Sequence, residues 1–274
     1  MKNFPAFPQE KARIGLLGVA FDENSSYKQG PALAPQRIRE AFFCDSANLW
    51  TEDETDLGAD GIFADAGDIT PSAATMPIET EQAAGHLYEA GLKVIAFGGD
   101  HSVTYPLVKV AAKHHPNLSI LHFDAHPDLY NNFENNSHSH ASPFARIMES
   151  GMVKRLVQVG IRTINGHQRE QAKRFGVEVL TMQRWQDVFN VQFDSPLYVT
   201  FDMDCLDPAF APGVSHWEPG GLSTREALSV IQSLQANIIG ADLVEFNPTQ
   251  DLSNMTGMVA AKIFKELAAK MLKF

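Results

Sequence analysis

Short apolar runs that end near glycine, aspartate or asparagine recur along the chain and alternate with longer amphipathic stretches. By length and flanking residues these runs are predicted strands, and they cover residues 13–21, 93–99, 118–126, 155–162, 177–181, 197–204 and 238–246. Strands that are apolar throughout are typical of parallel strands buried on both faces. The pattern therefore predicts an α/β fold, a three-layer α/β/α sandwich with a mostly parallel central sheet.

The stretches between the runs have the composition of helices. Predicted helices cover residues 79–91, 102–115, 169–176, 223–236 and 254–274. Ser223 followed by Glu226 has the spacing of a capping box at a helix start. Residues 44–80 are rich in loop-forming residues and carry no predicted element. Because no internal repeat or linker interrupts the 274 residues, we expect a single domain over residues 1–274.

The charge balance restricts the partners of the chain. The formal net charge is −11, and lysine and arginine form no cluster, so we expect no nucleic acid partner. No stretch approaches the roughly 20 apolar residues that span a bilayer, and the first residues lack the pattern of a signal peptide. We therefore expect no membrane association and a cytoplasmic location. An acidic protein of this kind suits a small cationic substrate.

Metal-binding side chains follow the predicted strands. In "LHFDAHPDLY", Asp124, His126 and Asp128 occupy every second position directly after an apolar run. Residues at this spacing on an extended segment point to one side. Because ligands of open α/β sheets gather at the carboxyl ends of the strands, these three side chains are candidates for a common site.

Two further strand ends supply the same kinds of side chain. Asp202 and Asp204 lie in "TFDMDCLDP", and His101 follows two glycines in "GGDHS". Each motif alone is more often a turn or a helix cap, but three of them at one sheet edge indicate a common site. Four unpaired carboxylates packed together would be strongly unfavourable, whereas two divalent cations would neutralise them. Mixed histidine and aspartate ligands favour manganese and leave nickel, cobalt, iron and zinc open, while calcium is disfavoured.

A pair of divalent ions favours hydrolysis, because such ions lower the pKa of a bound water. His140 is then a candidate proton carrier, with His138 as the alternative, and Glu245 in "DLVEFNP" is a candidate for holding a cation. His216 and Trp217 either line the entrance of the site or pack beneath it.

The stretches "GGDHS", "HFDAHPDL", "SHASPFARI", "FDMDCLDPAFAPG" and "VEFNP" resemble, in order and spacing, the ureohydrolase family of arginases and agmatinases. The likeness is greatest to the agmatinase-like branch that includes plant arginases. The resemblance implies an α/β/α sandwich assembled as trimers or hexamers. It also implies two manganese ions, one held by His101, Asp124, Asp128 and Asp202 and the other by Asp124, His126, Asp202 and Asp204.

The resemblance further implies the roles of three residues. In the family a hydroxide between the two ions attacks the guanidinium carbon of the substrate. The positions matching Asp128 and His140 move protons, and the position matching Glu245 binds the guanidinium group. Asp128, His140 and Glu245 are therefore the expected catalytic residues.

The motifs depart from animal-type arginases at one position that bears on the substrate, since Tyr130 stands where those enzymes have an asparagine that helps to read the amino acid carboxylate. Plant arginases also depart there. We expect agmatine, hydrolysed to putrescine and urea, with arginase, guanidinobutyrase and formimidoylglutamase activities as alternatives. Asn131, Asn132, Asn135 and Asn136 are candidates to contact the substrate tail. A non-enzymatic metal-binding protein would lack a ligand, and none is missing here.

Overall fold

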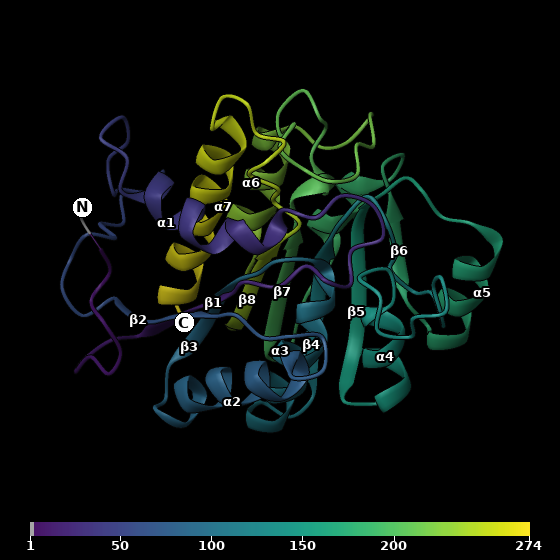
Figure 1. Ribbon diagram of the computed structural model, residues 1–274, viewed down its shortest axis with the longest axis horizontal. Helices are drawn as coiled ribbons and strands as arrows, with labels where there is room; N and C mark the ends of the chain where they lie inside the picture. Colours follow the sequence, from purple (N-terminus) through teal and green to yellow (C-terminus); the bar gives the residue numbers. More distant parts are fainter. Residues whose placement is uncertain (1–2) are drawn as a thin grey trace.

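The computed structural model describes residues 3–274 and contains one eight-stranded sheet with helices on both faces (Figure 1). The strands are β1 (Ile14–Val19), β2 (Phe63–Ile69), β3 (Lys93–Phe97), β4 (Leu118–Phe123), β5 (Val153–Ile161), β6 (Glu178–Thr181), β7 (Leu197–Asp202) and β8 (Ile238–Val244). Their order across the sheet is β2-β1-β3-β8-β7-β4-β5-β6. Every neighbouring pair is parallel, and the predicted α/β sandwich is confirmed.

The helices form the outer two layers. They are α1 (Ala34–Phe42), α2 (Met76–Glu89), α3 (Thr104–His114), α4 (Pro143–Ser150), α5 (Gly166–Phe175), α6 (Thr224–Ser233) and α7 (Met255–Leu272). Buried side chains of α1, α6 and α7 share one hydrophobic cluster, and those of α2 to α5 share the other. Figure 1 shows α6 and α7 above the sheet and α2 and α3 below it. The sheet therefore has an apolar core on each face.

Most predicted elements are present, with shifted boundaries. The capping box of α6 is formed, since Ser223 and Glu226 each bond the backbone N–H of the other. Three elements were not predicted, α1, α4 and β2. Strand β2 lies at the edge of the sheet, where only its first two residues are buried and the rest alternate in exposure. It therefore lacks the continuous apolar run by which central strands are recognised.

The strand order places the candidate site in the middle of the sheet. Strands β3, β8, β7 and β4 are adjacent and parallel, so their carboxyl ends meet at one edge. Gly99, just after β3, packs against the segment after β1, and a Cβ atom there would lie 1.6 Å from the carbonyl oxygen of Phe21. Only glycine therefore allows this close approach, which sets the path of the chain into His101.

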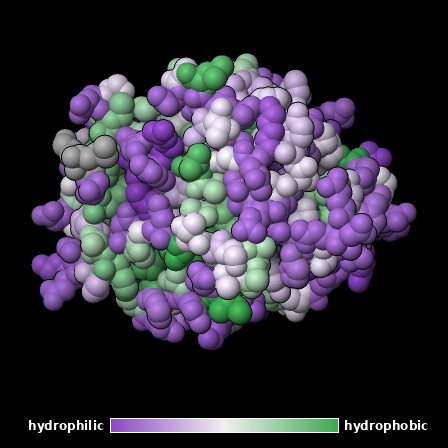
Figure 2. All heavy atoms as spheres, in the orientation of Figure 1, coloured by the Kyte–Doolittle hydropathy of each residue, from purple (hydrophilic) through white to green (hydrophobic). Residues whose placement is uncertain are grey.

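The outer surface is mixed in character. Figure 2 shows hydrophilic residues over most of the right half of one face and more hydrophobic residues on the left. Within residues 3–274, none of the helices combines the length and the apolarity that a membrane crossing requires.

Candidate metal centre

The six predicted metal ligands lie together at the carboxyl ends of three strands. His101 begins a 3₁₀ turn (His101–Val103) that follows β3, and the others follow or end β4 and β7. The side chains that converge are those of His101, Asp124, His126, Asp128, Asp202 and Asp204. All are buried except His126, which is partly exposed to the cavity described below.

His101 is surrounded by carboxylate oxygens. Its Nδ1 atom lies 3.1 Å from Oδ2 of each of Asp124, Asp128 and Asp202. Although the histidine is fully buried, this nitrogen forms no hydrogen bond with any described residue. One imidazole nitrogen and three carboxylate oxygens directed at the same point are a suitable donor set for a divalent cation.

A second group of donors adjoins the first. His126 Nδ1 lies 3.3 Å from Asp124 Oδ1 and 3.1 Å from Asp204 Oδ2. Asp124 therefore directs one carboxylate oxygen toward each group. This arrangement fits the predicted pair of ions with Asp124 between them, and the assignment of each ligand stays a prediction.

The pKa shifts of the buried aspartates also indicate a site that favours bound cations. Burial and the negative charges of Asp204 and Asp124 raise the pKa of Asp202 well above its ordinary value. Burial also acts to raise the pKa of Asp124, but its contacts with the neighbouring histidines His122, His101 and His126 outweigh it and lower that pKa. A group of buried carboxylates that repel one another is relieved by bound positive charge.

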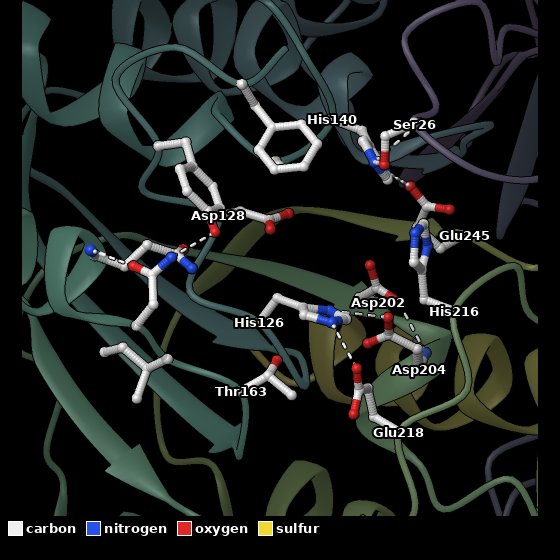
Figure 3. A pocket seen from close by; sticks show the side chains of 16 residues that line it. Ser26, His126, Asp128, His140, Thr163, Asp202, Asp204, His216, Glu218 and Glu245 are labelled. Atoms are coloured by element: carbon white, nitrogen blue, oxygen red, sulfur yellow. Dashed lines mark hydrogen bonds and ion pairs between the residues drawn. The ribbon is translucent and has the colours of Figure 1, made fainter.

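Two of the predicted catalytic residues have unusual backbone conformations. Asp128 has a φ of 49° and Glu245 a φ of 61°, a region that residues other than glycine rarely adopt. Such strain persists only where the surrounding structure imposes it, and it concentrates at functional sites. The conformations direct both carboxylates into the same cavity (Figure 3).

The cavity above the cluster has a volume of about 400 Å³. Six of the predicted site residues line it, and His101 and Asp124 lie beneath them. The lining consists of Ser26, His126, Asp128, Tyr130, Phe133, His140, Ala141, Thr163, Ile164, Asn165, Gln168, Asp202, Asp204, His216, Glu218 and Glu245. A cavity of this size holds a small molecule.

His140 and Glu245 form a pair at one side of the cavity (Figure 3). His140 Nδ1 lies 2.8 Å from Glu245 Oε1, and His140 Nε2 lies 2.8 Å from the hydroxyl of Ser26. Burial alone lowers the pKa of His140, but the charge of Glu245 and their hydrogen bond outweigh it and raise that pKa to about 9. The imidazole is therefore suited to carry a proton at neutral pH.

The structure also separates the remaining candidates. His140 lines the cavity, whereas His138 lies in a small separate depression beside Tyr105. His216 lines the cavity, and the neighbouring Trp217 is 43% exposed. Tyr130 is part of the lining. The four candidate asparagines, Asn131, Asn132, Asn135 and Asn136, are not.

Comparison with known proteins identifies the family. A profile described as "Arginase family" matches residues 12–269. The chain belongs to the arginase family. This arginase-family chain is 48% identical to "Arginase 1, mitochondrial" of Arabidopsis thaliana, over 96% of its own length and 82% of the relative. It is 31% identical to the agmatinase of Bacillus anthracis, over 97% and 94% of the two chains.

A solved structure agrees with this assignment. The arginase from Medicago truncatula superposes with a TM-score of 0.91 at 42% identity, covering 95% of the arginase-family chain and 88% of the solved chain. The predicted ureohydrolase family is thereby confirmed, and the chain is a hydrolase that acts on linear amidines. The Arabidopsis relative is mitochondrial by name, so the cytoplasmic location expected from the sequence stays a prediction.

Several residues of this arginase-family site were missed by the sequence reasoning. His122 contacts Asp124, Glu218 Oε1 lies 3.5 Å from His126 Nε2, and Ser26 contacts His140. The sequence does contain a signal for His122, because this residue lies two positions before Asp124 and so continues the alternating series toward the N-terminus. It contains no signal for Ser26, which lies in the loop after β1, far from the motifs in sequence.

Proposed function

We propose that the chain hydrolyses the guanidinium group of L-arginine to give ornithine and urea. The supporting observation is its 48% identity to a plant arginase along 96% of its length, against 31% to an agmatinase. Agmatine, the substrate expected from the motifs, has the weaker support. The arginase alternative therefore becomes the main proposal.

Two manganese ions would be held by the six clustered ligands. The orphaned nitrogen of His101, facing three carboxylate oxygens, is the observation that fits a cation best. When bound, the ions supply positive charge that lowers the pKa of a coordinated water and stabilises negative charge in the transition state. The residues around them bind the substrate and move protons.

Glu245 would bind the guanidinium group. Its Oε1 accepts hydrogen bonds from the backbone N–H of His101, at 3.0 Å, and from His140. Its Oε2 is buried and forms no hydrogen bond with any described residue. A guanidinium group donates in a planar fork that matches a carboxylate, and the cation compensates the buried charge. The free oxygen is therefore suited to hold the substrate over the cluster.

Two residues would handle protons. His140 carries a proton at neutral pH and would deliver it to the amine that leaves when the tetrahedral carbon collapses. Asp128 lies beside His101 at the edge of the cavity and would accept a proton from the attacking water and pass it on. Both act at fixed positions, so little reorganisation is needed during the reaction.

Agmatine is the second candidate, and the cavity itself favours it. The lining contains five carboxylates, Asp128, Asp202, Asp204, Glu218 and Glu245, and neither lysine nor arginine. The α-carboxylate of arginine would therefore meet no lysine or arginine side chain there and would face several carboxylates. Agmatine carries no carboxylate and avoids this repulsion.

A substrate panel distinguishes the candidates. Purified protein loaded with manganese is given arginine, agmatine, guanidinobutyrate or formiminoglutamate, and urea and formamide are measured. We expect urea, with arginine showing the highest kcat/KM. A tenfold preference for agmatine would make the protein an agmatinase, and formamide would indicate a formimidoylglutamase. The Asp204→Asn variant, which loses a proposed ligand, serves as the inactive control against contaminating hydrolases.

Two further expectations belong with this proposal. We propose that residues 1–274 act as a single domain, supported by the one sheet that joins strands from β1 to β8. We also propose a homo-oligomer, a trimer or hexamer, on the resemblance to the family. Light scattering of the purified protein measures its mass directly, and a monomeric mass would contradict the second expectation.

A further inference from the structure

We propose that His122 is a positioning residue that fixes the carboxylate of Asp124 for both ions, and that Gln158 sets the direction of this contact. The inference rests on the metal centre proposed above. By distance alone His122 is itself a candidate ligand, because His101, His122 and Asp124 each offer a donor atom within 4.8 Å of the others. The hydrogen bonds around its ring assign it a different role.

The ring of His122 is enclosed on all sides. His122 Nε2 lies 2.7 Å from Asp124 Oδ2, and His122 Nδ1 lies 3.0 Å from the side-chain nitrogen of Gln158. The ring stacks on Phe144, with centroids 3.9 Å apart and planes 26° from parallel. His122 and Gln158 are fully buried, so no solvent competes for these contacts.

The direction of each hydrogen bond follows from one backbone carbonyl. The side-chain nitrogen of Gln158 also lies 2.7 Å from the carbonyl oxygen of Pro127, which can only accept. The amide of Gln158 must therefore present its NH₂ group, because the flipped orientation would place two oxygens together. The same NH₂ group faces His122 Nδ1, so Nδ1 accepts. The ring proton is then on Nε2 and is donated to Asp124.

This tautomer excludes His122 as a ligand and gives it another function. A nitrogen that carries a proton has no lone pair for a metal ion. Instead, Asp124 Oδ2 is held by His122, and Asp124 Oδ1 accepts the backbone N–H of His126 at 2.6 Å. With both oxygens held, the carboxylate is fixed between the two donor groups. Outer partners of this kind typically contribute about 10–100-fold to metal affinity.

The first test measures manganese affinity by titration calorimetry in the full-length protein. His122→Phe keeps a flat ring against Phe144 but removes the donor, and we expect a loss of about 10–100-fold. His122→Gln restores a donor at the position of Nε2, and we expect recovery of most of the loss. His122→Asn places its donor one atom short and should behave like the phenylalanine variant. Unchanged affinity in His122→Phe, or no recovery in His122→Gln, overturns the proposal.

A second site of substitution tests the proposal in case the His122 variants misfold. Gln158→Glu leaves His122 in place but replaces the NH₂ donor with an acceptor that faces the carbonyl of Pro127. We expect it to weaken manganese binding while the circular dichroism spectrum stays that of the wild type. Wild-type affinity in this variant overturns the part assigned to Gln158.

The tautomer is measured independently of metal and activity. Long-range ¹H–¹⁵N NMR spectra of the metal-free protein, assigned with the His122→Gln variant, report which ring nitrogen of His122 carries the proton. We expect the proton on Nε2, and a proton on Nδ1 overturns the proposal. If the wild type binds manganese yet releases no urea from any guanidino compound, the proposed function fails, and the affinity series still decides the role of His122.

Discussion

His140 donates its Nδ1 proton to Glu245 Oε1 across 2.8 Å, while Ser26 approaches the opposite ring nitrogen with its hydroxyl, at 2.8 Å, and its backbone N–H, at 3.2 Å. The imidazole is therefore held between an acceptor and a donor. The carboxylate of Glu245 raises the pKa of His140, and the backbone N–H of Ser26 is directed at the other ring nitrogen, Nε2. Nε2, the ring nitrogen that does not contact Glu245, is therefore the atom from which His140 would transfer a proton.

Glu245→Gln tests the carboxylate directly. The amide has the same shape but no charge, so it attracts a guanidinium group poorly and no longer raises the pKa of His140. We expect kcat/KM to fall by at least about 10²–10³-fold, as when a single transition-state partner is removed. Manganese content, measured by atomic absorption, should remain that of the wild type. Near-wild-type turnover would remove Glu245 from the mechanism.

Manganese should stabilise the protein, because the cluster is a set of mutually repelling buried carboxylates without it. At a free concentration about 100 times its dissociation constant, the ion should add about 2.7 kcal/mol to the free energy of unfolding. Thermal melting with manganese or with a chelator measures the difference. Asp124→Asn, which removes the shared carboxylate, should lose most of the shift. Identical melting curves for the wild type under both conditions would argue against a metal centre.

Arg162 holds two loops of the site through backbone carbonyls. Its Nη2 donates to the carbonyl oxygens of Asp204 and Glu218, each at 2.6 Å, and its Nε donates to Glu218 at 2.8 Å. Lysine cannot reproduce this planar fork. We therefore expect Arg162→Lys to lower the free energy of unfolding by about 2 kcal/mol and to weaken manganese binding.

Urea denaturation in the presence of a chelator measures the stability change of Arg162→Lys, and titration calorimetry measures the affinity. Arg184→Lys is the matched control, because Arg184 is exposed and pairs only with Asp187 three positions later among the described residues. A stability equal to that of the control would show that the carbonyl contacts contribute nothing.

Glu52 should make stability depend on pH below its ordinary titration range. Its hydrogen bonds to Arg225 and Gln232, together with Lys262, lower its pKa. A lowered folded-state pKa adds stability that is present above the unfolded value of about 4.3 and is lost as the pH falls. At pH 7 we expect Glu52→Gln to cost at most about 1 kcal/mol, since the group is partly exposed.

The cost of Glu52→Gln should shrink as the pH falls below about 4, because Glu52 then takes up a proton in the unfolded wild type while it stays charged in the folded protein. Urea denaturation at pH 7, 5 and 3.5 follows this change. Glu170→Gln is the control, because Glu170 is exposed and forms no ion pair within residues 3–274. A cost that stays constant with pH would show that the charge of Glu52 contributes nothing.

The central strands and the clustered ligands were predictable because each leaves a local mark. The apolar runs of β4 and β7 are continuous, and the aspartates after them stand at alternate positions, so their shared direction follows from strand geometry. His101 could be placed with them because parallel strands end at one edge of a sheet.

Contacts between segments far apart in the chain were not predictable in this way. Ser26 reaches His140 across 114 positions, and nothing near either residue indicates the pairing. Gln158 lies in β5 amid apolar neighbours, and its role depends on the carbonyl of Pro127. Strand β2 and helices α1 and α4 were missed because their sequences lack the expected apolar runs, and packing against the rest of the fold determines them.

The position of β8 has a consequence for how the protein acquires its metal. This strand is the last of the sheet in chain order, yet it lies between β3 and β7. Until β8 has left the ribosome, no strand joins the strands that precede His101 (β1, β2 and β3) to the strands that the aspartates end or follow (β4 and β7). Metal loading therefore follows synthesis, and nascent chains stalled before residue 238 should fail to retain manganese.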